Sequence, residues 1–210
     1  MANILYKETE RFENLPFDEY LNLDCYSHSS LKNMKNGLQK DFVDSDKIAV
    51  GRMCDAILTG GDVDITSKYY DVSKKICFDI KGMFGAQIKS FKNQVSYLSK
   101  IEDAETSLSL MVSGRLDWEL GKLAVIDLKI NNSCRSIADC FALIDYMGYD
   151  NQVYHYARNM QSFYETKQLP KRYIAIYSTK IKDLFLAELK SEQKPENWWK
   201  NKVLEYGKVY

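Results

Sequence analysis

Two neighbouring segments near the middle of the chain alternate apolar and polar residues with a period of two. They cover residues 109–120 and 123–130, with Gly121 and Lys122 between them. Such alternation, interrupted by a glycine, is typical of two β-strands joined by a tight turn. The pattern therefore predicts a β-hairpin, and the pairing of its strands decides which side chains share a face.

Two pairing registers are open for this hairpin. A two-residue loop at Gly121 and Lys122 places Asp117 opposite Ile126, which mixes acids and aliphatic residues on both faces. The other register is one step longer. It pairs Leu120 with Ala124, Trp118 with Ile126, Asp117 with Asp127, and Arg115 with Lys129.

The longer register is favoured because it gives one wholly apolar face, whose burial stabilises the sheet. That face would hold Leu116, Trp118, Leu120, Ala124, Ile126, Leu128 and Ile130. The opposite face would hold Arg115, Asp117, Glu119, Asp127 and Lys129. Directly opposed side chains have Cβ atoms about 5 Å apart, so the two aspartates would be close enough to bind one divalent cation.

Two carboxylates and a lysine on one face suit the hydrolysis of phosphodiesters. Paired carboxylates repel each other unless a cation lies between them, and hard oxygen ligands favour Mg²⁺ or Mn²⁺. Such a cation polarises a phosphoryl oxygen and acidifies a bound water, and an ammonium group stabilises the developing charge. For a D-x-K triplet taken alone, an exposed face with an ordinary mixture of charges is the simpler explanation.

The rest of the chain is predicted to be mostly helical, with one further strand. Apolar residues recur at helical spacing, and Gly60-Gly61 and Pro170 act as stop signals. Helices are predicted over residues 27–40, 47–58, 137–146, 151–168 and 195–210, and a strand over 172–178. These elements predict a single α/β domain over residues 1–210, with a helical N-terminal part (1–105), a core (about 106–180) and a C-terminal helix (195–210).

Residues 68–100 form a basic stretch with interleaved aromatic residues, holding seven lysines and two aspartates. The stretch is either an amphipathic helical segment with a solvated lysine face or a surface that follows phosphates. In the second case Lys74, Lys75 and Lys89 would bind the substrate. Because the formal net charge of the chain is zero, any nucleic-acid surface must be a local patch.

Several classes of protein are disfavoured by composition. No apolar run approaches the roughly 20 residues that span a bilayer, and the N-terminal segment is highly charged, so a cytoplasmic protein without membrane contact is expected. The five cysteines are odd in number and contain no C-x-x-C pair, which argues against a disulfide framework or a zinc ribbon. We expect reduced structural thiols.

Three motifs resemble the core of the PD-(D/E)xK nucleases, in particular RecB-like and phage exonuclease VIII-like domains. They are Gly114-Arg115-Leu116-Asp117, Ile126-Asp127-Leu128-Lys129 and Gln152-x-x-x-Tyr156. Residues 27–32 and 50–58 resemble the opening segment and the G-x-x-x-H-x-x-L helix of the phage domains. The resemblance implies a restriction-endonuclease-like core, in which a central mixed β-sheet with a catalytic hairpin is flanked by helices.

The resemblance also implies an activity and a set of site residues. The chain would be a Mg²⁺- or Mn²⁺-dependent deoxyribonuclease, more specifically an exonuclease in recombination or DNA end processing. The metal ligands would be Asp117, Asp127 and Leu128, with Asp55 as a further carboxylate. The catalytic residues would be Asp117, Asp127, Lys129, Gln152 and Tyr156, and Arg115 would bind substrate. Gln152 and Tyr156 lie four residues apart, so they share one helix face.

The sequence departs from the family pattern at several positions. The metal-binding histidine of the family is Asp55 here, which is either a replacement ligand or a partly exposed acid paired with Arg52 or a lysine. The threonine that often follows the lysine is Ile130, and the four-cysteine spacing of relatives with an iron-sulfur cluster is missing, so no cluster is expected. His28 and His155 are interpreted as structural.

Two functions follow from different readings of these motifs. The first is the nuclease, for which the resemblance implies DNA as substrate and a single-strand annealing or recombination protein, or further copies of the chain, as partners. The second is a catalytically silent relative that binds DNA or a protein. The intact Asp117, Asp127 and Lys129 favour the enzyme, and the missing histidine favours the silent relative.

Overall fold

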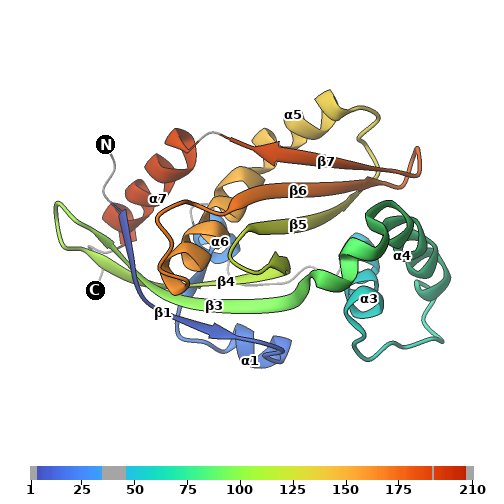
Figure 1. Cartoon of the computed structure of the whole chain (residues 1–210), viewed down its shortest axis with the longest axis horizontal. Coiled ribbons are helices and arrows are strands. Elements are labelled where there is room, and N and C mark those ends of the chain that lie inside the picture. The colour runs from blue at the N-terminus through green and yellow to red at the C-terminus, as the bar shows by residue number, and fades with distance from the viewer. Residues whose placement is uncertain (1–3, 35–45, 191, 207–210) are drawn as a thin grey trace.

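The computed structural model describes residues 4–34, 46–190 and 192–206. Its described part is built on a seven-stranded, mostly antiparallel sheet flanked by helices (Figure 1). The strands are β1 (Ile4–Phe12), β2 (Tyr26–Ser27), β3 (Lys92–Asp103), β4 (Ser109–Leu120), β5 (Ala124–Asn131), β6 (Lys171–Ser178) and β7 (Asp183–Leu189). They run in the order β1-β3-β4-β5-β6-β7, and β2 pairs with β4.

Parallel pairing occurs between β5 and β6 and between β2 and β4. Parallel neighbours need a long connection, and the chain makes the crossover from β5 to β6 through two helices. The helices of the fold are α1 (Phe17–Leu21), α2 (His28–Met34), α3 (Asp46–Thr59), α4 (Tyr70–Phe84), α5 (Ile137–Met147), α6 (Tyr149–Phe163) and α7 (Gln193–Tyr206), with a 3₁₀ helix η1 (Gly85–Ser90). None of the described helices is long and apolar enough to cross a membrane.

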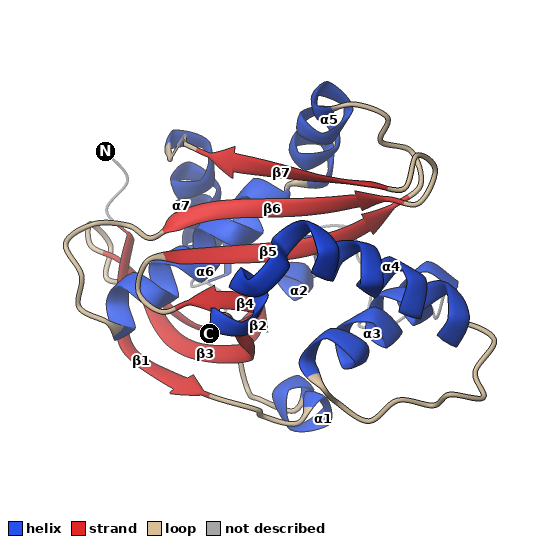
Figure 2. Ribbon diagram, turned by 45° about the vertical axis from the view of Figure 1, so that its right-hand side comes forward, coloured by secondary structure: helices blue, strands red, loops and turns tan. Residues whose placement is uncertain are grey.

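The two faces of the sheet are covered by different helices. Helices α5 and α6 pack on one face around Val125, Ile174 and Ile176, and α6 contacts strands β1, β3, β4, β5 and β6. Helices α3 and α4 pack on the other face around Trp118 and Ile126, and Figure 2 shows them beside β5. Because side chains of a strand alternate between faces, neighbours such as Val125 and Ile126 enter different parts of the core.

Local signals set the ends of the helices around the hairpin. Ser27 precedes α2 and accepts a hydrogen bond from Ser30 N at 3.1 Å, while Ser27 N donates to Ser30 Oγ at 2.7 Å. Ser136 caps α5 by accepting from Asp139 N at 3.1 Å. Gly148, with a φ of 67°, ends α5 in the left-handed conformation that glycine adopts readily, and α6 begins at the next residue.

Most predicted elements are confirmed, with shifted ends. The helices predicted over 47–58, 137–146, 151–168 and 195–210 correspond to α3, α5, α6 and α7, and the strand over 172–178 corresponds to β6. The helix predicted over 27–40 corresponds to α2, and residues 35–45 and 207–210 lie outside the described part.

The prediction of a helical N-terminal part over residues 1–105 is wrong in three places, because β1, β2 and β3 lie within it. In β3 the buried Tyr97, Ser99, Ile101 and Asp103 alternate with the less buried Leu98, Lys100 and Glu102. This period-two signal is masked in the sequence by the lysines and serines of the strand, since a buried serine does not register as an apolar position.

Candidate active site

The hairpin of β4 and β5 has the longer of the two registers. Leu120 pairs with Ala124 and Trp118 with Ile126, across a three-residue loop of residues 121–123. Leu123 N donates to Leu120 O at 3.0 Å, and Gly121 has a φ of 47°, a conformation disfavoured for residues with a Cβ. The register predicted from hydrophobic burial is therefore confirmed at the closed end of the hairpin.

The two strands separate where the acidic residues lie. The ladder ends at Trp118 and Ile126, so the expected backbone pairings of Asp117 with Asp127 and of Arg115 with Lys129 are not formed. Instead, Leu128 N donates to Asp117 Oδ2 at 2.7 Å. The carboxylate of Asp117 thus accepts a hydrogen bond from a main-chain N–H at the point where the regular ladder ends.

The strand β4 also changes face at Asp117. Its ladder with β3 passes from Asn93–Trp118 to Val95–Leu116 and omits the pair of Gln94 and Asp117. Trp118 packs with the α3 and α4 side, whereas Leu116 packs with the α5 and α6 side. The prediction of one wholly apolar face is therefore wrong at Leu116, because a local irregularity breaks the alternation.

Asp127 and Lys129 form a close ion pair on the face that α6 covers. Lys129 Nζ lies 2.6 Å from Asp127 Oδ2, and their side chains are 22% and 2% exposed. The ring of Tyr149, from the first turn of α6, lies 4.9 Å from the same Nζ. Burial alone would lower the pKa of Lys129, but the charges of Asp127 and Asp117 outweigh it and raise the pKa, so the side chain is an ammonium ion.

Asp117 completes a compact group with this pair. Its pKa is raised to about 8, first by burial, then by the neighbouring charge of Asp127 and, more weakly, by that of Asp55, while Lys129 opposes these effects. Two carboxylates are thus held together in a place where both cannot be ionised at low cost. A cation between them would relieve that repulsion.

The donor set fits a hard divalent cation held by two carboxylates. Asp127 Oδ2 is buried and accepts no well-directed hydrogen bond, even though Lys129 is in ion-pair contact with it. Leu128 lies between Asp127 and Lys129 in the sequence, and it can contribute only its main-chain carbonyl oxygen to a cation. Among the residues that the structure describes, no group of three or more His, Cys, Asp or Glu side chains is placed to hold a metal ion.

Asp55 approaches the pair from α3. Burial raises the pKa of its carboxyl group, and the charge of Arg115 and a hydrogen bond from Gln94 Nε2 oppose that rise. Its charge contributes to the raised pKa of Asp117. The predicted proximity of this helix to the acidic residues is therefore present, and Asp55 is bound to a glutamine rather than to Arg52 or a lysine in the described contacts.

Gln152 and Tyr156 lie together on α6 as their spacing predicts. Gln152 Nε2 donates to the Tyr156 hydroxyl at 2.6 Å. Burial and then the charges of Asp127 and Asp117 raise the pKa of Tyr156 well above its usual value, so its hydroxyl stays protonated beside the acids. Gly114, which begins the Gly114-Arg115-Leu116-Asp117 motif, permits the close approach of Tyr156 to β4, because a Cβ at position 114 would lie 2.8 Å from Tyr156 Cδ1.

Arg115 faces the acids from a tethered position. Its Nη1 donates to Leu15 O at 2.6 Å, its Nε donates to Gln94, and its guanidinium lies 5.6 Å from the ring of Phe17. Asp117 and Asp55 are among the charges that act on it. The structure thus places Arg115 at the rim of the candidate site.

The basic stretch is divided among three elements. Helix α4 buries Ser73, Ile76, Cys77 and Ile80, so the lysines between them point outward. Lys74, Lys75 and Lys89 are exposed, on α4 and η1, and form no ion pair with any residue of the described chain. The structure therefore leaves them available but does not bring them into the acidic cluster.

Glu119 is separate from the site, although it was expected on the same face. It is fully buried and accepts hydrogen bonds from Tyr97 and Tyr164 at 2.6 and 2.7 Å, and it pairs with Arg11 at 3.1 Å. This network ties β4 to β1, β3 and the end of α6. Glu119 is a structural carboxylate with every partner supplied by the protein.

The two histidines are also structural, as interpreted from the sequence. His155 is fully buried, and its ring nitrogens contact the Tyr6 hydroxyl at 3.0 Å and Ser113 O at 3.1 Å. His28 lies 4.9 Å from the ring of Trp198. Burial lowers the pKa of His155 to about 4 and that of His28 to about 3, so both rings are neutral at pH 7.

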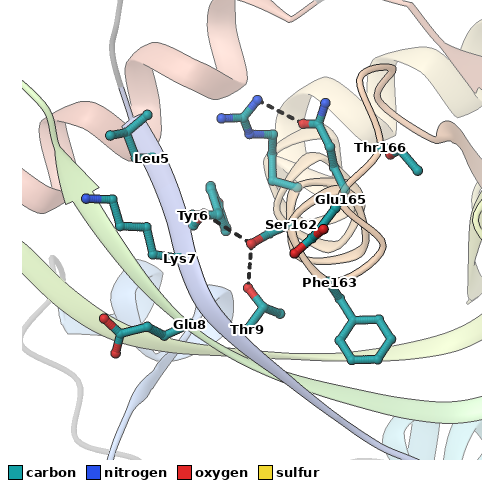
Figure 3. Close-up of a pocket in the computed structure, with 11 residues that line it drawn as sticks. Leu5, Tyr6, Lys7, Glu8, Thr9, Ser162, Phe163, Glu165 and Thr166 are labelled. Atoms are coloured by element: carbon teal, nitrogen blue, oxygen red, sulfur yellow. Dashed lines mark hydrogen bonds between the residues drawn. The ribbon is translucent and has the colours of Figure 1, made fainter.

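A pocket of about 650 Å³ lies elsewhere, between β1 and the last turns of α6 (Figure 3). Thr9 donates to Ser162 at 2.8 Å and Ser162 donates to Tyr6 O at 3.1 Å, while Arg158 donates to Gln161 at 3.0 Å. These polar groups satisfy one another. The pocket holds none of the acids discussed above, and the hairpin site is the better candidate.

Sequence reasoning missed two residues of the site. Tyr149 shares a face of α6 with Gln152 and Tyr156, at spacings of three and seven, so helical periodicity carries a signal for it. Gln94 has no such signal, because its position depends on the irregularity in β3.

The comparisons with known proteins concern the fold. No protein-family model matches the sequence, and no curated protein sequence matches it. A crystal structure from Eubacterium rectale, described as a candidate exonuclease, is similar to this chain with a TM-score of 0.66 and 16% sequence identity. The similarity covers 94% of this chain and 88% of the other. At this identity the likeness shows a shared α/β fold.

Proposed function

We propose that the chain is a divalent-metal-dependent deoxyribonuclease of the PD-(D/E)xK type, acting as an exonuclease on DNA ends. The observation that carries the proposal is the cluster of Asp117, Asp127 and Lys129 at the point where β4 and β5 separate. Support also comes from the structural neighbour, which is described as a candidate exonuclease. A role in recombination or DNA end processing belongs to the same proposal.

In this proposal Asp117 and Asp127 hold the cation, together with the main-chain carbonyl of Leu128. Bound Mg²⁺ or Mn²⁺ would supply Lewis-acid activation of the phosphate and of a water molecule. The Lys129 ammonium, already held beside Asp127 at 2.6 Å, stabilises negative charge that develops on the phosphate. Tyr156 keeps its proton and presents a hydroxyl fixed by Gln152, which suits contact with a phosphate oxygen.

The substrate side of the proposal rests on positive charge at the rim. Arg115 is held by Leu15 and Gln94 near the acids, where its guanidinium can contact the scissile strand. The exposed Lys74, Lys75 and Lys89 would attract the flanking DNA electrostatically. We extend the partners to a single-strand annealing or recombination protein and to further copies of the chain, which would use the same DNA end.

Cleavage of defined DNA substrates tests the proposal. Linear duplex labelled at one end, closed circular duplex and single strands are each incubated with Mg²⁺, Mn²⁺ or EDTA. We expect degradation of the linear forms with either metal, none with EDTA, and no cleavage of the closed circle. Cleavage of the closed circle would contradict the exonuclease mode, and early or late release of the single end label would give the polarity.

A catalytically silent DNA-binding relative is the second candidate. The observation that favours it is the absence, within the described residues, of a third acidic or histidine ligand grouped with the two aspartates. A silent protein would bind labelled DNA in gel-shift assays with and without Mg²⁺ and would leave the DNA intact.

A further inference from the structure

One residue that the proposed function uses only to hold Arg115 lies directly opposite Asp117. Gln94 lies near the start of β3, and the ladder with β4 is interrupted at this residue alone between Lys92 and Glu102. Its φ is 52°, in the left-handed region that residues with a side chain rarely adopt. A non-glycine residue kept in such a conformation is held there by its surroundings, and residues of this kind gather at functional sites.

The side chain of Gln94 joins two charged residues from different elements. Its Nε2 donates to Asp55 Oδ1 of α3, and its Oε1 accepts from Arg115 Nε of β4 at 2.5 Å. An amide has one donor end and one acceptor end, so it can satisfy a carboxylate and a guanidinium at once. Gln94 thus lies between two opposite charges and fixes the direction of each.

Both of these charged residues act on Asp117. Asp55 raises the pKa of Asp117, and Arg115 interacts with both Asp117 and Asp55. The other end of Arg115 is fixed by Leu15 O at 2.6 Å, so the amide is its only tie toward α3 in the described contacts. Removal of the amide would free Asp55 and Arg115 to pair directly and to turn away from Asp117.

We propose that Gln94 is a positioning residue: by holding Asp55 and Arg115 beside Asp117, it sets the charges around a divalent cation and a DNA phosphate bound at Asp117 and Asp127. The inference rests on the proposed function, since it assumes those two ligands. Groups that orient residues around a metal change metal affinity or activity by about 10- to 100-fold when they are removed. An effect of that size is expected here although Gln94 does not touch the cation.

Glycine is the informative substitution, because it removes the amide and also relieves the unfavourable φ. We expect Gln94→Gly to keep the thermal midpoint of the wild type, to bind Mn²⁺ at least tenfold more weakly by calorimetry, and to cleave DNA at least tenfold more slowly. Raising the Mn²⁺ concentration should restore part of kcat, which a purely structural defect would not allow. Gln94→Glu should be at least as impaired, because a carboxylate cannot donate to Asp55.

The exposed Gln87 of η1 provides a matched control, and Gln87→Gly should behave as the wild type. Mn²⁺ affinity and cleavage of Gln94→Gly equal to those of the wild type would overturn this inference and leave the proposed function in place. A wild-type protein that neither binds Mn²⁺ nor cleaves DNA would overturn both.

Discussion

Gly114 gives a direct test of how closely α6 must approach the hairpin. In Gly114→Ala the new Cβ would lie 2.8 Å from Tyr156 Cδ1 and 3.0 Å from Tyr156 Cε1 and Asn159 Nδ2. Ordinary contacts begin near 3.4 Å, so the ring must retreat by about 0.6 Å or more. Overpacking of this kind costs about 1–3 kcal/mol.

The displacement should affect both stability and activity. For a chain of this size a loss of about 2 kcal/mol lowers the thermal midpoint by about 4–8 °C. The Tyr156 hydroxyl, fixed by Gln152 at 2.6 Å, would leave its position beside the acids. A shift approaching 1 Å can lower the rate by about 100-fold, so we expect cleavage to fall by 10- to 100-fold.

Calorimetric melting and cleavage of end-labelled duplex measure these effects. Gly82→Ala on α4 is the control, because nothing lies within 4 Å of its Cβ position, and it should be neutral or slightly stabilising. A Gly114→Ala protein with the wild-type midpoint and full cleavage would refute the reasoning that this glycine places Tyr156.

Three further outcomes follow from charge. Lys129→Met leaves the Asp127 carboxylate without its ammonium partner and should lower the free energy of unfolding, measured in urea at pH 8, by about 3 kcal/mol, part of which Mn²⁺ restores. An unchanged urea midpoint would contradict a buried ion pair. His155 has a folded pKa of about 4, below the usual 6.5, so the stability due to its neutral ring is present above pH 6.5 and is lost as the pH falls from 6.5 to 4. The loss approaches about 3 kcal/mol, and His155→Gln should have a correspondingly shallower pH dependence. Replacing Lys74, Lys75 and Lys89 together by Gln should lower the salt dependence of DNA binding by up to about 3 in the log–log slope without changing the thermal midpoint, and an identical slope would make them an ordinary solvated face.

The sequence predicted the closed end of the hairpin and not its open end. Burial of Trp118 and Ile126 on one face sets the register. The residue pattern alone shows which register buries these side chains. The separation of the strands depends on a side chain, since Asp117 accepts the hydrogen bond of Leu128 N. Such competition between side chain and backbone leaves the hydrophobic pattern unchanged, and Leu116 was therefore assigned to the wrong face.

The same distinction applies to the rest of the site. The spacing of Gln152 and Tyr156 is a helical repeat, and their hydrogen bond follows from it. The bridge from Asp55 through Gln94 to Arg115 joins three elements and requires an unusual φ at Gln94. No local propensity indicates such a contact, so only the assembled fold reveals it.

The carboxylates of the hairpin are proposed to perform the chemistry, and Asp127→Asn tests this role most directly. This substitution keeps the size of the buried side chain while removing its charge. End-labelled linear duplex with Mg²⁺ should be degraded by the wild type and at least about 1000-fold more slowly by Asp127→Asn, with equal DNA affinity in EDTA. Degradation by Asp127→Asn at the wild-type rate would contradict the account.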